Sequence, residues 1–286
     1  MNITFVGGGN MAGALIGGLL KHGYRPDQIK VAELDRGACD ALFARFAVST
    51  HTEIAPAIEG SDCIVLAVKP QQLGKAAADL APLLKNQLVI SIAAGVRCRD
   101  LARWLQGHQR LVRVMPNTPA LIAAGVSALY AMPEVDADQR SLAAQIFDAV
   151  GMTIWLESEE QLDAITALSG SGPAYVFYFV EALQQAALEL GFAPQTARKL
   201  SLATFDGAIR LAAQSSDAVD VLRARVTSKG GTTERALSVM QEAEVKQHIV
   251  RAIHEAAQRS AELGDELGQE PRDAAVDGRG KASGHA

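Results

Sequence analysis

The sequence predicts an α/β fold: an N-terminal Rossmann-type doubly wound parallel sheet followed by an all-helical C-terminal dimerisation domain. Over the first half of the chain, short apolar runs alternate with helical stretches, which is typical of a parallel sheet covered on both faces. A glycine turn with dinucleotide spacing follows the first apolar run. Past about Glu157 the strand patterns stop and long helical periods replace them.

Strands are predicted where apolar and β-branched residues run without interruption, and helices where apolar residues recur at helical spacing. The predicted strands are residues 3–6, 29–32, 62–68, 88–92 and 111–115. The predicted helices of the first half are residues 10–22, 37–46, 71–84 and 97–105. This alternation predicts a doubly wound sheet.

The second half is predicted to be helical throughout. The expected helices are residues 159–168, 173–190, 194–213, 219–226, 232–241 and 244–263. The stretch 173–213 is too apolar to face water on every side, so it lies in a large helical core or packs against another subunit, and we favour the subunit. From Gly264 on there is no apolar period. The predicted domains are therefore a dinucleotide-binding domain (1–157), a helical substrate-binding and dimerisation domain (158–265) and a disordered tail (266–286).

The composition narrows the class of protein. A net charge of -5 without a basic block argues against nucleic acid as a partner. Cys39, Cys63 and Cys98 are isolated, which favours a reducing compartment, and the six histidines show no metal-ligand spacing. No basic leader precedes the first strand, and the apolar stretches are too short to span a bilayer. We expect a cytoplasmic protein with no metal site and no membrane contact.

The glycine turn predicts a dinucleotide site. In the spacing Gly7-x-Gly9-x-x-Ala12, Gly7 makes the tight turn, Gly9 lets a pyrophosphate approach the backbone, and Ala12 permits close packing of helix on strand. Such turns also arise for packing reasons alone, but a strand before and a helix after favour a cofactor. The predicted cofactor contacts here are Val6, Gly7, Gly8, Gly9, Asn10, Met11 and Ala12.

Two residues beyond the second strand bear on the choice between NADH and NADPH. Glu33 lies where an acid usually holds the ribose hydroxyls of NAD and repels the extra phosphate of NADP. Arg36 lies three residues on and is suited to a 2′-phosphate. Both are also ordinary residues of a solvated loop, so the cofactor stays open as NADPH or NADH.

The ends of three further strands lie at the edge where open α/β sheets bind ligands. Small residues there leave room for a flat nicotinamide ring, and Asn117 can bind a ligand or cap a turn. Simple strand termination explains each segment equally well when it is taken singly. The predicted cofactor contacts in these segments are Ala67, Val68, Lys69, Pro70, Ala93, Ala94 and Asn117.

The run Ser228-Lys229-Gly230-Gly231-Thr232-Thr233 predicts a second anion site. The two glycines leave backbone N–H groups uncovered, and a helical pattern follows at once. The first N–H groups of a helix lack intrahelical partners and favour negative charge. Together with the cofactor turn, this run indicates an enzyme with two substrates.

These motifs, in this order, resemble those of pyrroline-5-carboxylate reductases. The matching segments are GGGNMA (7–12), AVKPQ (67–71), AAGV (93–96), RVMPNTPA (113–120), LSGSGPAY (168–175) and RVTSKGGTT (225–233). They span about residues 3–263, and the last two are the most specific. The resemblance implies hydride transfer from NAD(P)H to the C=N bond of 1-pyrroline-5-carboxylate, giving L-proline, the last step of proline synthesis.

The resemblance also implies an intertwined homodimer, often joined into a larger ring, in which the glycine–threonine loop meets a nicotinamide held by its own or a neighbouring subunit. By position, Ala93 and Ala94 back the nicotinamide, and Glu159 and Arg225 contact the cofactor. The implied substrate contacts are Ser228, Gly230, Gly231, Thr232 and Thr233, with Thr233 as the residue placed in catalysis.

Several positions depart from the family pattern. Lys229 stands where many members have proline, and Ala203 replaces a common glutamine. Residues 216–219 (SDAV) differ from a Glu-x-His-Pro pattern of some members, and the loop before Asp62 lacks an asparagine often found near the adenosine. These departures concern details of the site rather than the reaction.

Two other functions remain as alternatives. A hydroxyacid dehydrogenase needs a basic catalytic residue on the long helix after the first domain, but residues 173–190 contain no lysine or histidine; an acyclic imine reductase is a related option. A non-enzymatic nucleotide sensor or scaffold would also keep the fold, because fold alone does not prove activity. The intact loop at 228–233 argues against it.

Overall fold

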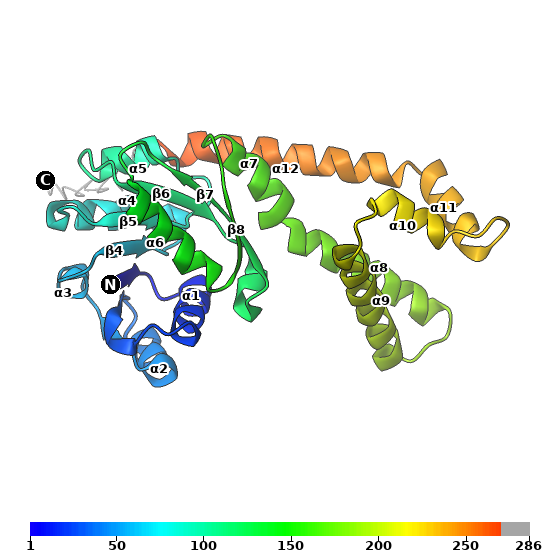
Figure 1. Cartoon of the computed structure of the whole chain (residues 1–286), viewed down its shortest axis with the longest axis horizontal. Helices are drawn as coiled ribbons and strands as arrows, with labels where there is room; N and C mark the ends of the chain where they lie inside the picture. The colour runs from blue at the N-terminus through cyan, green and yellow to red at the C-terminus, as the bar shows by residue number, and fades with distance from the viewer. Residues whose placement is uncertain (270–286) are drawn as a thin grey trace, which may run out of the picture.

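The computed structural model describes residues 1–269. It consists of a body that contains the sheet, up to the end of the last strand at Trp155, and a helical arm that begins at Gln161. In Figure 1 the arm projects away from the body, and the long helix α12 (Val245–Leu267) runs back from the far end of the arm to the body. Within residues 1–269 no helix combines the length and the apolar character that a membrane crossing requires.

The body is built on one eight-stranded sheet with the order β3-β2-β1-β4-β5-β6-β7-β8. All neighbouring strands are parallel except β6 and β7, which are antiparallel. The strands are β1 (Ile3–Val6), β2 (Ile29–Ala32), β3 (Ser49–His51), β4 (Cys63–Leu66), β5 (Leu88–Ser91), β6 (Leu111–Met115), β7 (Gly125–Ala131) and β8 (Gly151–Trp155).

Helices cover both faces of this sheet, which confirms the predicted Rossmann-type fold. They are α1 (Asn10–Lys21), α2 (Arg36–Phe46), α3 (Ile54–Ile58), α4 (Pro70–Leu80), α5 (Cys98–Trp104) and α6 (Ala137–Asp148). Short 3₁₀ turns are η1 (Pro26–Gln28), η2 (Ala81–Leu83) and η3 (Thr118–Ile122). The helix predicted at 71–84 is thus α4 followed by η2.

The apolar runs of the strands build two core layers, one on each face of the sheet. Along β4, Cys63 and Val65 belong to the layer beneath α1 and α6, whereas Ile64 and Leu66 belong to the layer beneath α4 and α5. Successive side chains of a strand point to opposite faces, so an uninterrupted apolar run is needed to fill both layers. This double burial is why the parallel strands were detectable in the sequence.

Five elements were not predicted: β3, α3, β7, α6 and β8. The edge strand β8 is half-exposed along its length, and β3 has only three residues, so neither shows the buried apolar run of the central strands. β7 reverses direction and pairs antiparallel with β6. The prediction of a purely parallel sheet therefore holds for β1–β6 and for the β7–β8 pair, but not across β6 and β7.

The arm is helical throughout, as predicted. Its elements are α7 (Gln161–Ile165), the π-helical segment η4 (Thr166–Gly170), α8 (Gly172–Glu189), α9 (Pro194–Gln214), α10 (Val219–Arg225) and α11 (Thr232–Glu242). The helix predicted at 159–168 is therefore split into α7 and a π-helical turn. Pro173 and Pro194 lie in the first turns of α8 and α9, where a missing N–H costs no hydrogen bond.

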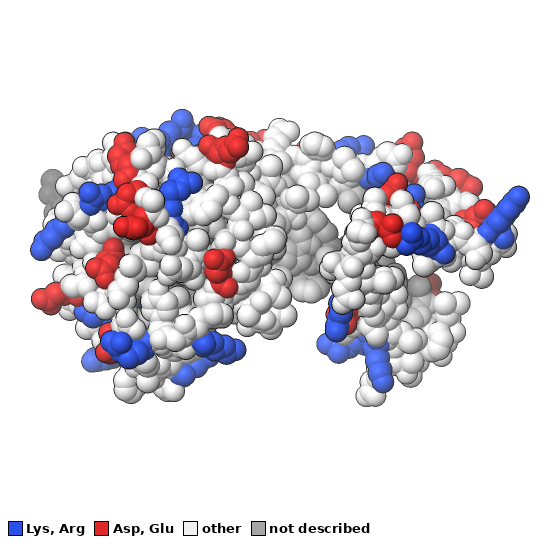
Figure 2. All heavy atoms as spheres, viewed as in Figure 1, with Lys and Arg blue, Asp and Glu red and all other residues white. Residues whose placement is uncertain are grey.

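The paired helices α8 and α9 leave much of their apolar surface exposed. Phe177 is 67% exposed and Tyr178 71%, values far from those of a core residue. Figure 2 shows few charged side chains on the surface between the body and the arm. Other exposed apolar residues of this region are Val176, Leu183, Leu188, Leu190, Phe192, Leu200, Leu202, Ile209 and Leu211.

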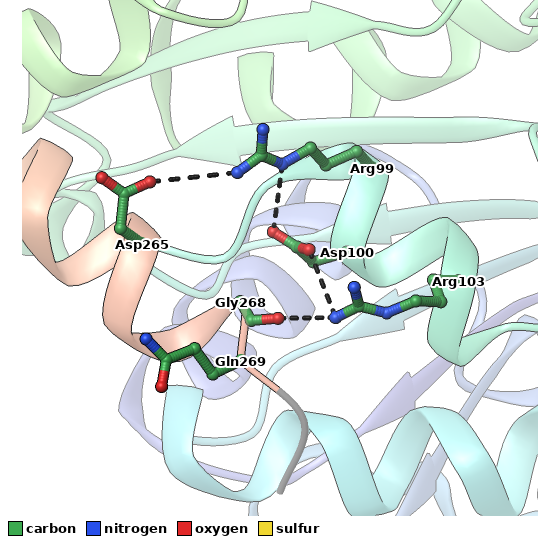
Figure 3. Close-up of a pocket in the computed structure, with 6 residues that line it drawn as sticks. All are labelled: Arg99, Asp100, Arg103, Asp265, Gly268 and Gln269. Carbon is green, nitrogen blue, oxygen red and sulfur yellow. Dashed lines mark hydrogen bonds and ion pairs between the residues drawn. The ribbon is translucent and has the colours of Figure 1, made fainter.

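The end of α12 docks on the body, which corrects the predicted start of the tail. The helix continues to Leu267, which packs against the core layer beneath α5, and the Gly268 carbonyl accepts a hydrogen bond of 2.5 Å from Arg103. Figure 3 shows α5 residues facing Asp265, Gly268 and Gln269. The predicted disorder is therefore wrong for residues 266–269, where α12 ends against α5; residues 270–286 lie outside the described part.

Candidate functional site

The predicted cofactor segments meet at one edge of the sheet. Val6 is level with Leu66 across β1 and β4, and Leu66 is level with Ser91 across β4 and β5. The turns that follow these strands therefore leave the sheet side by side. Because β1 lies between β2 and β4, this edge is also where the strand order reverses, the position at which open α/β sheets bind their ligands.

The three glycines of the first turn serve different purposes. Gly7 has φ +100, and a Cβ there would lie 2.8 Å from the backbone of Ala67, so the turn requires glycine both for conformation and for space. A Cβ at Gly8 would lie 2.6 Å from the side chain of Leu42. No atom lies within 4 Å of a Cβ built at Gly9, so open space adjoins this residue.

That open space lies at the N-terminus of α1. Gly9 is the N-cap residue and has no side chain to satisfy the first N–H groups, and the first turn of the helix contains no acidic residue. Free N–H groups at the start of a twelve-residue helix attract an anion. The residues present therefore fit the pyrophosphate of a dinucleotide, with Gly9, Asn10 and Met11 as its backbone neighbours.

Glu33 is held against this turn by two backbone donors. Its Oε2 accepts a hydrogen bond of 2.8 Å from the Gly8 N–H, and its Oε1 accepts one of 3.1 Å from the Asp35 N–H. Asp35 itself caps α2 by accepting from the Ala38 N–H at 2.7 Å. Arg36, the first residue of α2, is exposed. The structure thus brings the predicted ribose-binding acid to the glycine turn.

The loop after β5 is held from behind by the end of α12. Gly95 has φ +80, and a Cβ there would lie 3.0 Å from Leu267 and 3.5 Å from Leu263. Arg97 adds an ion pair of 2.6 Å with Asp265. Ala93 is buried and Ala94 is partly exposed, so this loop, which includes both predicted nicotinamide neighbours, rests on a helix that the sequence did not place there.

The side chain of Asn117, a predicted cofactor contact, is already hydrogen-bonded within the protein. Asn117 accepts from the Val126 N–H at 2.8 Å, and its amide nitrogen donates to the backbone oxygen and the hydroxyl of Ser169, each at 3.2 Å. It therefore links the end of β6 to β7 and to η4. Asn117 is buried, which leaves little of it for a ligand.

Glu159 joins the start of the arm to the sheet. Its Oε1 accepts from Arg113 at 2.9 Å and from the Cys98 N–H at 2.7 Å, so it pairs a cation of β6 and caps α5. The Arg113 side chain is only 5% exposed. Burial, chiefly, and the Glu159 carboxylate raise the pKa of the Cys98 thiol, so this thiol remains protonated. A cofactor role for Glu159 would have to coexist with this structural one.

The glycine–threonine loop connects α10 to α11. Gly230 has φ +72, and its N–H donates a hydrogen bond of 2.6 Å to Glu234, an acid of the first turn of α11 that the sequence analysis did not single out. Gly231 is the N-cap of α11 and no side chain caps the helix. Within residues 1–269, the hydroxyls of Thr232 and Thr233 make no hydrogen bond. They are therefore free to bind a ligand.

The single chain does not bring this loop to the cofactor turn. Figure 1 places α10 and α11 at the far end of the arm, away from β1 and α1. Arg225, another predicted contact, forms an ion pair with Asp217 at that end. Ser228 and Lys229 are exposed. The two halves of the predicted site therefore lie apart in the single chain.

Comparisons with known proteins match both parts of the chain. Residues 159–263 match the family model for pyrroline-5-carboxylate reductase dimerisation, and residues 2–95 match that for NADP oxidoreductase, coenzyme F420-dependent. A pyrroline-5-carboxylate reductase from Pseudomonas aeruginosa is 43% identical over 93% of this chain and 98% of its own length. One from Pasteurella multocida is 39% identical over 92% of this chain and 97% of its own.

Solved structures agree. A pyrroline-5-carboxylate reductase from Coxiella burnetii superposes with a TM-score of 0.86 at 42% identity, covering 92% of this chain and 98% of that one. A Plasmodium falciparum pyrroline carboxylate reductase solved with NADP bound superposes with a TM-score of 0.83 at 26% identity, with the same coverage.

The dinucleotide turn at the switch point and the helical arm behind it define an NAD(P)-dependent oxidoreductase of the Rossmann type. The arm matches the dimerisation model of one group of these enzymes. The chain belongs to the pyrroline-5-carboxylate reductase family.

Proposed function

We propose that this chain reduces the C=N bond of 1-pyrroline-5-carboxylate with NAD(P)H and releases L-proline, the last step of proline synthesis. The observation that carries the proposal is the 43% identity with the Pseudomonas aeruginosa pyrroline-5-carboxylate reductase over 93% of the chain. The glycine–threonine loop supports it, because the free threonine hydroxyls and the uncapped N–H groups at the start of α11 are suited to a small carboxylate.

The residues divide the work between cofactor and substrate. NAD(P)H supplies the hydride when bound, and the chain supplies position and charge complementarity. The N–H groups at the start of α1 bind the pyrophosphate, and Ala93 and Ala94 leave room for the flat ring. The first N–H groups of α11 hold the substrate carboxylate, and the Thr233 hydroxyl binds the carboxylate or the ring nitrogen.

No dedicated proton donor is required in this scheme. A protonated cyclic imine is already a strong electrophile, so holding donor and acceptor in register supplies most of the rate, on the order of 7–11 kcal/mol in favourable cases. This fits a loop whose free groups are two threonine hydroxyls rather than a histidine or a cysteine. The acid nearest to the loop, Glu234, is held by the Gly230 N–H.

The test is turnover by the purified protein. Incubation with NADPH or NADH and pyrroline-5-carboxylate should oxidise the cofactor, with a fall in absorbance at the nicotinamide band and one proline formed per cofactor consumed. A 2-oxo acid in place of the imine tests the hydroxyacid dehydrogenase alternative. Cofactor binding without turnover of either substrate would support the nucleotide-sensor alternative.

We further propose that the enzyme is a homodimer, or a larger ring of dimers, built by α8 and α9. The exposed apolar side chains on these helices support this, since a monomer would leave them in water. The separation of the glycine–threonine loop from the cofactor turn within one chain also supports the proposal, because in a dimer the loop of the second chain would complete the site. The proposal keeps the domain limits 1–157 and 158–265. It also places the protein in the cytoplasm, because three unpaired buried cysteines favour a reducing compartment.

Placing a charge on this surface should separate the subunits. Phe177→Asp should lower the mass measured by light scattering from that of a dimer to that of a monomer, and activity should fall with it, because burying an unpaired carboxylate in an interface is costly. Phe43→Asp is the matched control, since Phe43 is 61% exposed but lies on α2 of the body. A wild-type protein that is a fully active monomer at assay concentration would contradict the proposal.

A further inference from the structure

We infer that this chain selects NADH over NADPH and that Glu33 is the residue that makes the selection. The inference rests on the proposed function, because it concerns the cofactor of the same reaction. It is carried by the position of the Glu33 carboxylate, which is fixed against the glycine turn rather than free on the surface.

The carboxylate of Glu33 is preorganised as a hydrogen-bond acceptor. Each of its oxygens accepts one backbone N–H, from Gly8 and from Asp35, so the side chain is held at the junction of the β1 turn and the β2–α2 loop. An ionised carboxylate has further lone pairs for the ribose hydroxyls of NADH, which are donors. Little side-chain entropy is then lost on binding.

The same position opposes NADPH. The dianionic 2′-phosphate of NADPH has no hydrogen-bond donor to offer Glu33 at neutral pH. It also adds negative charge beside an ionised carboxylate. Other acids crowd the same corner: Asp35 caps α2, and Asp40 and Glu53 line the recess next to Arg36. Arg36 is the only lysine or arginine among the residues lining that recess, so cations are outnumbered.

The thiol of Cys39 is buried under this corner, close to the carboxylates of Glu33, Asp40 and Asp35. Burial is the first cause that raises its pKa, and the carboxylates of Glu33, Asp40 and Asp35 raise it further. The Cys39 sulfur also donates a hydrogen bond to the Glu33 carbonyl at 3.2 Å, which ties the acid's backbone to α2. A phosphate brought to this corner would meet the same field.

Gly8 shows that the arrangement is built into the turn. A Cβ at Gly8 would come within 3.3 Å of the Glu33 Oε2 and 2.6 Å of Leu42, so a side chain there would displace the acid or the helix behind it. The dinucleotide spacing itself requires glycine only at 7 and 9. The third glycine is therefore explained by the approach of Glu33 and Leu42.

Calorimetric titration with the oxidised cofactors tests the inference without turnover. The wild-type protein should bind NAD⁺ at least about tenfold more tightly than NADP⁺, a difference of about 1.4 kcal/mol. Glu33→Gln keeps the size of the side chain but removes its charge. In this variant the ratio of the NADP⁺ Kd to the NAD⁺ Kd should fall to about threefold or less, because NADP⁺ binds more tightly. Glu33→Ser should shift the ratio in the same direction, and thermal unfolding checks that both variants are folded.

Glu134→Gln is the matched control, because Glu134 is an exposed acid of the same domain in the loop before α6. It should leave the ratio unchanged. Wild-type protein that binds NADP⁺ as tightly as NAD⁺ or more tightly would overturn the inference, as would a ratio that Glu33→Gln leaves intact. A selective loss of NADP⁺ binding in Arg36→Ala, with NADP⁺ preferred by the wild type, would assign the selection to Arg36. Failure to bind either cofactor would instead contradict the proposed function.

Discussion

Thr233→Ala should lower kcat/KM for pyrroline-5-carboxylate by about ten- to more than a hundredfold, which is the effect of losing a hydrogen bond to a charged ligand group. The Thr233 hydroxyl follows the Gly230–Gly231 bend, and it has no hydrogen-bond partner within residues 1–269. A group left without a partner next to free N–H groups is available to the substrate. Steady-state kinetics at saturating cofactor measure the effect, and the KM for the cofactor should stay nearly the same.

The competing explanation makes Thr233 a cap of α11. A lost cap costs about 1 kcal/mol of stability and leaves catalysis near normal in the folded fraction. In the structure Gly231 is the N-cap and no side chain caps the helix, which argues against that role. Thr227→Ala is the matched control, since Thr227 follows α10 and its hydroxyl already donates a hydrogen bond of 2.6 Å to the carbonyl of Arg223 in that helix. Earlier melting of Thr233→Ala with normal turnover would show that the substrate is held elsewhere.

The cofactor half of the site was more predictable than the substrate half, because its signals are local. Gly7, Gly9 and Ala12 follow one strand and open one helix, so their spacing alone predicts a turn that the structure contains. The glycine–threonine loop was equally visible as a motif. Its distance from the cofactor turn was not visible, since that depends on the direction in which the arm leaves the body.

Long-range partners were beyond the reach of the sequence. Leu267 packs on Gly95, and Arg97 pairs with Asp265, although more than 160 residues separate each pair. The end of α12 meets the body through Gly264, Asp265 and Leu267, of which only Leu267 is a large apolar residue, so the sequence there shows no apolar period that predicts packing. Contacts of this kind are set by tertiary packing and leave almost no local signal.

Glu159→Gln should destabilise the folded protein by about 3 kcal/mol, at the lower end of what it costs to remove one partner of a buried ion pair. Arg113 is 5% exposed and Glu159 18%, so the guanidinium would stay buried without a counter-charge, whereas the partial exposure of Glu159 moderates the loss. The Cys98 N–H would keep only a neutral acceptor. Thermal unfolding should show a midpoint lower by roughly 6–12 °C, from about 2–4 °C per kcal/mol for a chain of this size.

The same substitution separates the structural role of Glu159 from the cofactor contact implied by the family resemblance. Glu160→Gln is the matched control, because Glu160 is the adjacent residue, is exposed, and forms no ion pair in the described part of the chain. Removing both charges, in Arg113→Met with Glu159→Leu, should recover part of the lost stability, since no buried charge is then left unpaired. A Glu159→Gln protein that melts normally but shows a raised KM for the cofactor would place the carboxylate on the cofactor. Earlier melting with an unchanged KM means that Glu159 serves to fasten the arm to β6 and α5, and that the cofactor is held by the turns at the sheet edge.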